Sequence, residues 1–497
     1  MRKSRTLLLV LVFLTASCTV ISEPASSSIE NTENSWTTKA PMPQGKSDLG
    51  LTVVDRKIYA IGGTIKNYVD SWTEGFSGTR KVVNTNYEYD PALDRWVTKP
   101  PMPTPRYNFA TVVHEDSIYC LGGTYFVGNP PYHGTAVLTA AVEVFNLSTN
   151  KWEKKTPMPT RRGFFATILY ADNIYCIGGG INEVYNIATD TWQTEAPMPF
   201  NGSVTTANVV NGKLYLTSDS LMYIYNPATN SWASKEAIQT ETYGPVSAVI
   251  DNKIYFISAN LTQIYDTETD TVSLGAPPLP NYFGVALAMT GDMAPKRIYI
   301  CGETLQVYDP ETDSWTIGAK MPTNRDSVSF AVVNEKIYAI GGNIGINSPG
   351  VFPNYPTISV TQYATNEEYT PIGYGTAPPK IYVISPENQN YNVSSVPLTF
   401  TVNRPVAWMG YSLDGEDNVT IDGNTTIAEL SNGLHNITVY AKDSFENTGA
   451  SEAISFSVDV PESFPTLVVT AVAVASLAVV GIGLLVYFKK RRVKSGG

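Results

Sequence analysis

Short runs of apolar residues recur along most of this chain in a fixed order. The clearest copy lies between Trp152 and Trp192, where Pro-Met-Pro, a pair of arginines and an apolar run at 164–170 are followed by Asn-Ile-Tyr-Cys-Ile. Three glycines, a Glu-Val-Tyr run and the turn Ala-Thr-Asp complete this copy. The order recurs seven times, which indicates a repeat architecture. An Ile-Tyr or Leu-Tyr pair marks the copies, at Tyr59, Tyr119, Tyr175, Tyr215, Tyr255, Tyr299 and Tyr338.

Each copy predicts four short β-strands. Its apolar and β-branched residues form runs of a few positions, and Gly, Pro, Asn and Asp lie between the runs. This punctuation excludes long helices over the repeats. A four-stranded sheet of this size cannot bury both of its faces alone, so neighbouring copies must stack, and radial repetition is a stable way to stack them. The pattern therefore predicts an all-β region with one sheet per copy.

The repeat resembles the kelch motif, in which an arginine, an apolar strand, Ile-Tyr with Gly-Gly shortly after it, Val-Tyr and a tryptophan follow one another. The resemblance covers about residues 36–370 and implies a seven-bladed kelch-type β-propeller with one copy per blade. It is weaker in the middle, where Ser218-Asp219 and Ala259-Asn260 replace Gly-Gly. Ring closure has two candidates, because Asn34-Ser35-Trp36 resembles a fourth strand and competes with Glu367–Pro371 for the last place.

A second β-rich region follows the repeats. Residues 371–379 form a Pro/Gly linker, and residues 380–460 show seven short strand-like runs, a number typical of a β-sandwich. The segment Asn432–Asp443 resembles the closing strands of Ig-like modules in prokaryotic surface proteins, which implies an Ig-like β-sandwich acting as a stalk. The runs are Ile381–Ile384, Leu398–Val402, Trp408–Leu413, Asn418–Ile421, Thr426–Leu430, His435–Ala441 and Ala453–Val458.

The two ends carry targeting and anchoring patterns. Residues 1–22 combine a basic start, an apolar stretch and small residues, which is the layout of a signal peptide, and Cys18 is a candidate for lipid modification. Thr466–Phe488 is uncharged and is followed by the basic tail 489–497, which predicts one C-terminal transmembrane helix. We therefore expect a single-pass cell-membrane protein with its N-terminal ectodomain outside and its C-terminal tail in the cytoplasm.

Charge and cysteine content narrow the class of protein. The formal net charge of −11 argues against nucleic acid as a partner, because phosphate binding needs a basic surface. Cys120 and Cys176 hold equivalent positions in adjacent copies, where stacked strands lie about 10 Å apart, too far for a disulfide. We expect them, and Cys301, to be buried thiols.

Three copies are longer than the others, and their extra residues follow Gly-Gly. The insertions are Thr64–Asn86, Thr124–Ala140 and Asn343–Ile358, in copies one, two and seven, which become neighbours when the ring closes. Adjacent antiparallel strands place the start of the first strand and the end of the second at one end, so residues at both places should share a face. Thirteen residues before the marker tyrosine, four copies carry a basic residue there: Lys46, Arg106, Arg162 and Arg325.

These basic residues and the aromatic residues of the loops are the candidate ligand-binding site. In the kelch propellers that this chain resembles, arginines at this position line the ligand-binding mouth, although lysine lacks the planar fork that suits a carboxylate. The alternative is structural, with the cations bonded to backbone carbonyls between blades and the aromatic residues packing the loops. The aromatic candidates are Trp72, Tyr125, Tyr132 and Tyr355, and further Tyr68, Phe126 and Phe352.

Catalysis finds little support in the sequence. The three histidines show no metal-site spacing, and no Ser-His-Asp order can be argued, so we expect no catalytic residue, metal or cofactor. We expect a cell-surface binding or adhesion protein that uses one propeller face to bind an acidic glycan or a protein partner. The alternatives are a glycan-active kelch enzyme of the sialic-acid type and a structural envelope component.

Overall fold

The computed structural model of the 497-residue chain describes residues 32–71, 75–127, 135–202, 204–218, 221–235, 246–280, 286–301, 304–348, 357–461 and 466–493. The expected signal peptide and Cys18 lie outside these residues. The signal peptide, the lipid modification and the location outside the cell therefore stay predictions.

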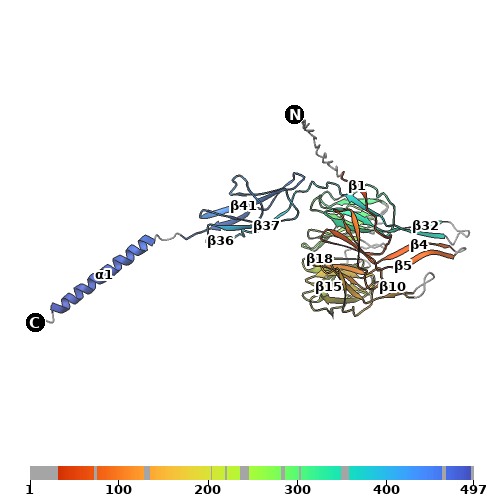
Figure 1. The fold of residues 1–497 in the computed structure, drawn as a ribbon, viewed down its shortest axis with the longest axis horizontal. Coiled ribbons are helices and arrows are strands. Elements are labelled where there is room, and N and C mark those ends of the chain that lie inside the picture. The colour runs from red at the N-terminus through yellow and green to blue at the C-terminus, as the bar shows by residue number, and fades with distance from the viewer. Residues whose placement is uncertain are drawn as a thin grey trace, which may run out of the picture. The chain divides into compact units, whose positions relative to one another are not determined.

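Seven four-stranded antiparallel sheets form the repeat region, and we number them blades I to VII (Figure 1). Blade I holds β2 (Gly50–Val54), β3 (Lys57–Ile61), β6 (Asn86–Asp90) and β7 (Arg95–Lys99); blade II holds β8 (Ala110–His114), β9 (Ser117–Leu121), β12 (Val142–Asn146) and β13 (Lys151–Lys155). Blade III holds β14 (Ala166–Tyr170), β15 (Asn173–Gly178), β16 (Ile181–Asn186) and β17 (Thr191–Thr194). Blade IV holds β18 (Thr206–Val210), β19 (Lys213–Ser218), β20 (Leu221–Asn226) and β21 (Ser231–Lys235).

The remaining three blades keep the same order. Blade V holds β22 (Val246–Ile250), β23 (Lys253–Ser258), β24 (Leu261–Asp266) and β25 (Thr271–Gly275); blade VI holds β26 (Ala286–Thr290), β27 (Arg297–Cys301), β28 (Leu305–Asp309) and β29 (Ser314–Ile317). Blade VII holds β30 (Ser329–Val333), β31 (Lys336–Ile340), β34 (Asn366–Thr370) and β1 (Ser35–Lys39). The middle blades form although Gly-Gly is missing from two of them, because the apolar runs and the turns persist.

The seven blades close into a ring. The first strand of each blade lies beside the first strand of the next, and β30 of blade VII lies beside β2 of blade I. Seven separate apolar clusters fill the seven blade interfaces, and each draws buried residues from two adjacent sheets. No blade buries both of its faces without its neighbours, which is the physical reason for the circle. The predicted β-propeller is confirmed.

The N-terminal strand β1 completes blade VII. It pairs antiparallel with β34, with Trp36 opposite Tyr369, and the Trp36 indole Nε1 donates a hydrogen bond of 2.8 Å to the Ala319 carbonyl of blade VI. The choice that the sequence left open is thereby settled, since β34 is the third strand of this blade and β1 is the fourth. Residues from opposite ends of the repeat region thus hold the ring shut.

A hydrogen-bonded turn recurs between the third and fourth strands. In blade I the Tyr89 hydroxyl donates to the Asp94 carboxylate over 2.7 Å, and the same carboxylate oxygen accepts the Ala40 backbone N–H over 2.8 Å. Asp94 has a φ of 46°, a left-handed conformation that Asp and Asn tolerate better than other side chains. The turn therefore explains why Asp or Asn recurs at this place in the repeats, as at Asp190, Asn230, Asp270, Asp313 and Asn34.

Residues 381–458 form two sheets that share one apolar core. The smaller sheet has the order β35-β37-β40, and the larger has the order β36-β43-β41-β38-β39 with β42 beside β41. Residues of both sheets, including Leu398 and Val439, are fully buried in the same cluster. The seven expected strands all form, and the sequence missed only the short β36 and β42. The strands are β35 (Ile381–Ser385), β36 (Asn390–Tyr391), β37 (Val396–Val402), β38 (Trp408–Leu413), β39 (Val419–Ile421), β40 (Thr425–Ile427), β41 (Gly433–Lys442), β42 (Thr448–Ala450) and β43 (Ile454–Val458).

The C-terminal helix α1 (Thr466–Val493) corrects one expectation. Among the residues that the structure describes, no helix is both long enough and apolar enough to cross a membrane. The prediction of a transmembrane helix at Thr466–Phe488 is wrong on this finding, and the fold class is all-β with a single helix among the described residues.

Candidate functional site

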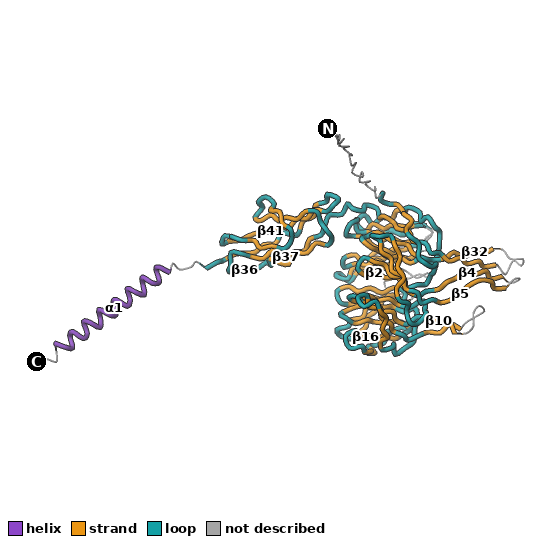
Figure 2. The backbone as a smooth tube through the Cα atoms, viewed as in Figure 1, coloured by secondary structure: helices purple, strands orange, loops and turns teal. Residues whose placement is uncertain are grey.

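Three hairpins project from the same side of blades VII, I and II (Figures 1 and 2). They are β32 (Asn343–Ser348) with β33 (Thr357–Gln362), β4 (Thr64–Ser71) with β5 (Gly75–Val82), and β10 (Thr124–Val127) with β11 (Thr135–Leu138). The first two hairpins pair through β33 and β4 into one sheet with the order β32-β33-β4-β5, and β10 lies beside β5. We call these six strands the strand wall. The prediction that the long insertions gather in one sector is confirmed.

Glycine pairs turn the chain from each blade into the strand wall. Gly62 and Gly63 have φ values of 58° and 97°, and a Cβ on Gly63 would lie 2.5 Å from the Ser47 carbonyl oxygen, so only glycine fits. The next residue, Thr64, exchanges two backbone hydrogen bonds of 3.0 and 2.8 Å with Ser47. Each hairpin is therefore tied to the connection that enters its own blade. The equivalent pairs are Tyr107 with Thr124 and Asp326 with Asn343.

The aromatic candidates are only partly placed. Tyr125 is half-buried on β10, and the neighbouring Phe126 packs on Tyr107 with ring centroids 5.6 Å apart. The candidate positions Trp72, Tyr132 and Tyr355 lie outside the described residues, as does Phe352, and no side chain is described at Tyr68. A ligand-binding role of these aromatic residues stays a prediction.

The four basic candidates are buried inside their blades. Lys46 and Arg106 have exposed fractions of 0%, Arg325 of 4% and Arg162 of 7%. Each side chain donates to a backbone carbonyl fourteen residues later, near the end of the second strand. The distances are 2.9 Å to Ala60, 3.0 Å to Cys120, 3.1 Å to Cys176 and 2.7 Å to Ala339.

Three buried glutamates neutralise the arginines, and sequence reasoning missed them. Glu143 pairs with Arg106 at 3.1 Å, Glu183 pairs with Arg162, and Glu367 pairs with Arg325 at 2.6 Å. A threonine at the preceding connection donates its hydroxyl to the same carboxylate in each blade: Thr104, Thr160 and Thr323. The signal was present in the sequence, because Glu stands two residues before the third-strand aromatic residue in these blades and in no other.

Among the residues that the structure describes, Lys46 has no carboxylate partner. Tyr87 occupies the place of the glutamate in blade I, and its ring centroid lies 4.6 Å from the Lys46 ammonium nitrogen. The ammonium group also donates to the Thr85 hydroxyl over 3.1 Å. Burial without a counter-charge lowers the pKa of Lys46 from 10.5 to about 7.

These contacts match the structural alternative for the four basic residues. Their charged groups bond carbonyls, hydroxyls and carboxylates of their own blades, whereas an acidic ligand would need them to face solvent. Breaking a buried ion pair leaves an uncompensated charge in the interior, which is costly. The basic residues are thus placed where they fix the end of the second strand, directly below the Gly-Gly turn, which starts the strand wall in blades I, II and VII.

An exposed apolar patch lies next to the strand wall on the same face. Phe164 is 72% exposed and has a φ of 55°, which is an outlier for a bulky side chain. Its neighbour Gly163 lies against Thr124 and Leu138 at the base of the β10–β11 hairpin, and Leu138 is 43% exposed. Beside Phe164 opens a pocket of about 500 Å³ whose lining includes Phe165 and Val204. We call Leu138, Phe164, Phe165 and Val204 the apolar patch.

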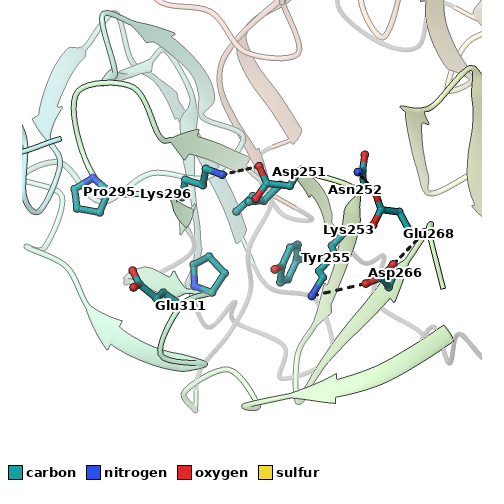
Figure 3. Close-up of a pocket in the computed structure, with 11 residues that line it drawn as sticks. Asp251, Asn252, Lys253, Tyr255, Asp266, Glu268, Pro295, Lys296 and Glu311 are labelled. Atoms are coloured by element: carbon teal, nitrogen blue, oxygen red, sulfur yellow. Dashed lines mark hydrogen bonds and ion pairs between the residues drawn. The ribbon is translucent and has the colours of Figure 1, made fainter. Parts of the chain in front are cut away.

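A second pocket, of about 500 Å³, lies at the opposite ends of the strands, between blades V and VI (Figure 3). Its carboxylates are largely engaged: Asp251 pairs with Lys296 at 2.5 Å, and Glu268 accepts a hydrogen bond from Asn252. Lys253 lies 3.8 Å from Asp266. Within the described residues, no group of His, Cys, Asp and Glu is arranged to hold a metal ion. This pocket offers surface charge without a buried reactive group.

The three cysteines of the blades are buried thiols, as expected. Burial raises the pKa of Cys120 to about 12, although the nearby Arg106 opposes this shift. These thiols are therefore protonated at neutral pH and pack as small apolar groups.

Comparison with known proteins agrees with the repeat geometry. The kelch motif matches residues 46–103 and 105–159. The chain is similar to the kelch-like protein terF of Aspergillus terreus, 34% identical over 146 residues, which cover 29% of this chain and 30% of that protein. It is 27% identical over 144 residues to beta-scruin of Limulus polyphemus, covering 29% of this chain and 14% of that protein. It is 33% identical over 151 residues to kelch repeat protein C2 of vaccinia virus (strain Western Reserve), covering 30% of this chain and 25% of that protein.

Each match spans less than a third of the relative's length. Within residues 46–159, the matched motif coincides with blades I and II and with the connections that carry Lys46 and Arg106. The later blades repeat the same hydrogen-bonded turns and interface clusters. The sequence matches and the geometry together show that this chain carries kelch repeats folded as a β-propeller.

Proposed function

We propose that this propeller is a protein-binding module and that its partner contacts the face that carries the strand wall and the apolar patch. Kelch repeat proteins commonly bind proteins. The observation that carries the proposal is the uneven decoration of the ring. Blades VII, I and II extend into six additional strands, and a strained, exposed phenylalanine stands at their base.

The exposed phenylalanine favours a protein surface over an acidic glycan. Burying an aromatic side chain of this size on a partner removes a large apolar area from water. The same positive φ occurs at the equivalent Asp48, Asn108 and Ser327, so the repeat imposes this backbone conformation, and in blade III it carries an exposed aromatic ring. The cations that would serve a sugar carboxylate are buried and occupied, so an acidic glycan, or a glycan-active enzyme, would need other groups on this face.

The second β-region enters the proposal as a spacer. Its two sheets with one shared core support the likeness of residues 380–460 to Ig-like modules. In this role it carries the propeller without taking part in binding, so substitutions on its surface leave partner affinity unchanged.

The test replaces Phe164 by asparagine in the full chain. Asn tolerates the left-handed backbone at this position, so Phe164→Asn keeps or raises the stability of the protein while it removes the exposed ring. Proteins retained by the immobilised chain are identified by mass spectrometry, and the affinity of each purified candidate is measured by calorimetry. We expect Phe164→Asn to weaken binding of the true partner about tenfold or more, as for an aromatic hot spot.

The matched control is Leu274→Asn. Leu274 is 70% exposed on the outer strand of blade V, away from the strand wall, so its removal tests the effect of lost apolar surface in general. Equal affinity of the wild type and Phe164→Asn for every retained protein would contradict the proposal. So would a glycan array that gives saturable binding to an acidic sugar in both forms, because the partner would then be a glycan.

A further inference from the structure

The sheet of the strand wall has two edges that differ in their protection. Its strand order is β32-β33-β4-β5, so β32 and β5 are the edge strands. β5 carries Arg80 and Lys81 and lies beside β10, and charged residues and neighbouring elements are common ways to block an edge. β32 has the sequence Asn-Ile-Gly-Ile-Asn-Ser, with no charged residue and no proline. The β5 edge is thus guarded against pairing with another strand, and the β32 edge is not.

The register shows which backbone groups of β32 face outward. The Tyr363 N–H donates to the Gly342 carbonyl over 2.9 Å, and hydrogen-bonded pairs alternate along an antiparallel ladder. Ile344 and Ile346 therefore direct their N–H and C=O groups toward β33. Asn343, Gly345 and Asn347 direct theirs away from it. The strand thus presents an outward row of three backbone positions.

The first of these outward positions is already paired. Asn343 donates its N–H to the Asp326 carbonyl over 2.9 Å and accepts the Asp326 N–H over 2.6 Å. This bridge confirms the alternation, because it uses the groups that the register assigns to the outer edge. After this single pair the segment that contains Asp326 no longer runs along β32. Beyond Asn343, the blade therefore provides no strand to pair with the outer edge of β32.

The next two outward positions are open within the described part of the chain. Gly345 and Asn347 have no backbone partner among the described residues beyond β33. Gly345 is exposed, and a Cβ built on it would meet no atom within 4 Å, so a neighbouring strand has room there. Backbone N–H and C=O groups are strong hydrogen-bonding groups, and an edge of this kind is a template for another strand.

We propose that β32 binds an extended segment of a partner protein, which adds a fifth strand to the sheet and pairs with the backbone of Gly345 and Asn347. The inference rests on the proposed protein-binding function and names the form that the partner presents. In this mode main-chain hydrogen bonds supply affinity, and alternate side chains of the added strand supply specificity. The partner segment is uncharged and carries β-branched residues, because it pairs with an uncharged strand that contains Ile344 and Ile346.

The experiment selects peptides of about 12 residues from a random display library on the immobilised full chain, a length that spans such an edge. The selected peptides are synthesised, and their affinities are compared between the wild type and Asn347→Pro. Proline removes the outward N–H at position 347 without removing a donor from the β32–β33 ladder. We expect Asn347→Pro to weaken binding roughly tenfold, as for two or more hydrogen bonds lost or misaligned.

The matched control is Gly78→Pro on the guarded edge. The Val83 N–H donates to the Gly63 carbonyl, and the same alternation turns the backbone of Gly78 outward on β5. Gly78→Pro should leave peptide affinity unchanged. A second measurement holds even if Asn347→Pro disturbs the hairpin: residue-resolved hydrogen exchange of the wild type with bound peptide should slow at Gly345 and Asn347 and stay unchanged at Ile344 and Ile346.

Several outcomes would overturn the inference. They are a library that yields no binder, peptides whose affinity survives Asn347→Pro, and added protection that does not alternate along β32. A concentration-dependent dimer that Asn347→Pro abolishes would assign the edge to a second copy of this chain instead. The proposed function is tested separately by Phe164→Asn. A partner whose affinity falls with Phe164→Asn and is unchanged by Asn347→Pro would contradict this inference and leave the proposed function standing.

Discussion

Blades VII and I are neighbours and both carry a hairpin of the strand wall, but different residues occupy their equivalent buried positions. In blade VII the cation is Arg325, and Glu367 neutralises it at 2.6 Å. In blade I the cation is Lys46, and Tyr87 stands where the glutamate would be. The comparison shows that a buried cation can donate to the second-strand carbonyl at this place with or without a carboxylate partner.

Blades VII and I also differ in the hydrogen bonds of a buried asparagine. Asn366 of blade VII donates from its side chain to the Ala40 carbonyl over 3.4 Å, and its side chain lies near the Tyr89 hydroxyl of blade I. The equivalent Asn86 of blade I is fully buried, and neither of its side-chain polar atoms has a partner within the described part of the chain. The adjacent blade II carries Phe145 instead of tyrosine, so the hydroxyl is missing. The amide nitrogen of Asn86 therefore lacks the partner that Asn366 has in the neighbouring blade.

The largest effect is expected from breaking the complete blade. Glu367→Leu leaves Arg325 charged and buried, with 4% of it exposed, and should lower the free energy of unfolding by about 3–5 kcal/mol. Urea unfolding followed by tryptophan fluorescence measures it. The double variant Glu367→Leu with Arg325→Met removes both charges and should recover most of the loss. If the single variant costs no more than the double variant, the pair does not neutralise a buried charge.

The ring could be predicted from the sequence because the residues that indicate it lie close together within each copy of the repeat. Trp and Tyr recur in a fixed order, each repeat turn needs an Asp or Asn that tolerates a positive φ, and Gly-Gly marks where the wall begins, as at Gly62 and Gly63. The positions of the four basic residues near one end of the blades follow from strand parity, which is also local. These features were predictable because each depends on residues within one copy.

The errors came from contacts between residues far apart in sequence and from side-chain burial. Arg325 and Glu367 are 42 residues apart, and a basic residue in a loop looks the same in sequence whether it faces solvent or a carboxylate. The pairing of β33 with β4 joins blades VII and I across the ring closure and could not be seen in either copy alone. For Thr466–Phe488, length and apolarity predicted a membrane span that the described residues do not support.

An intermediate effect is expected from the lone cation of blade I. Lys46 has a pKa of about 7 in the folded protein and 10.5 without burial, so the unfolded chain binds its proton more tightly between these values. The contribution of Lys46 to the free energy of unfolding is highest above pH 10.5. It falls by up to about 1.4 kcal/mol per pH unit as the pH drops toward 7, and it is constant below pH 7. Lys46→Met removes this pH dependence of stability. When both proteins are taken from pH 9 to pH 7, the free energy of unfolding of the variant should therefore rise by about 2 kcal/mol relative to that of the wild type.

The comparison uses urea unfolding at both pH values, with Lys253→Met as the control because Lys253 is an exposed lysine of blade V. A difference between the wild type and Lys46→Met that is the same at pH 9 and pH 7 would mean that Lys46 stays fully charged in the fold. In that case Tyr87 and Thr85 would be compensating the ammonium group as well as a glutamate does.

The smallest effect is expected from restoring the missing hydroxyl in blade II. The Phe145 ring occupies the place of its repeat equivalents: its centroid lies 5.2 Å from Trp152, as that of Tyr89 lies 4.9 Å from Trp96. Phe145→Tyr thus puts a hydroxyl near Asn86 and the turn residue Asn150, where the same pair of contacts forms around Tyr89. One or two new buried hydrogen bonds should raise the free energy of unfolding by about 1 kcal/mol.

The control is Phe256→Tyr, because Phe256 is 1% exposed in the interface cluster of blades IV and V, and no other blade places a tyrosine hydroxyl at that position. A hydroxyl buried there without a partner should lower stability. If Phe145→Tyr is as destabilising as Phe256→Tyr, the orphaned amide of Asn86 is not a missing-hydroxyl site. Blade I would then differ from blade VII in its charge and not in its neutral polar contacts.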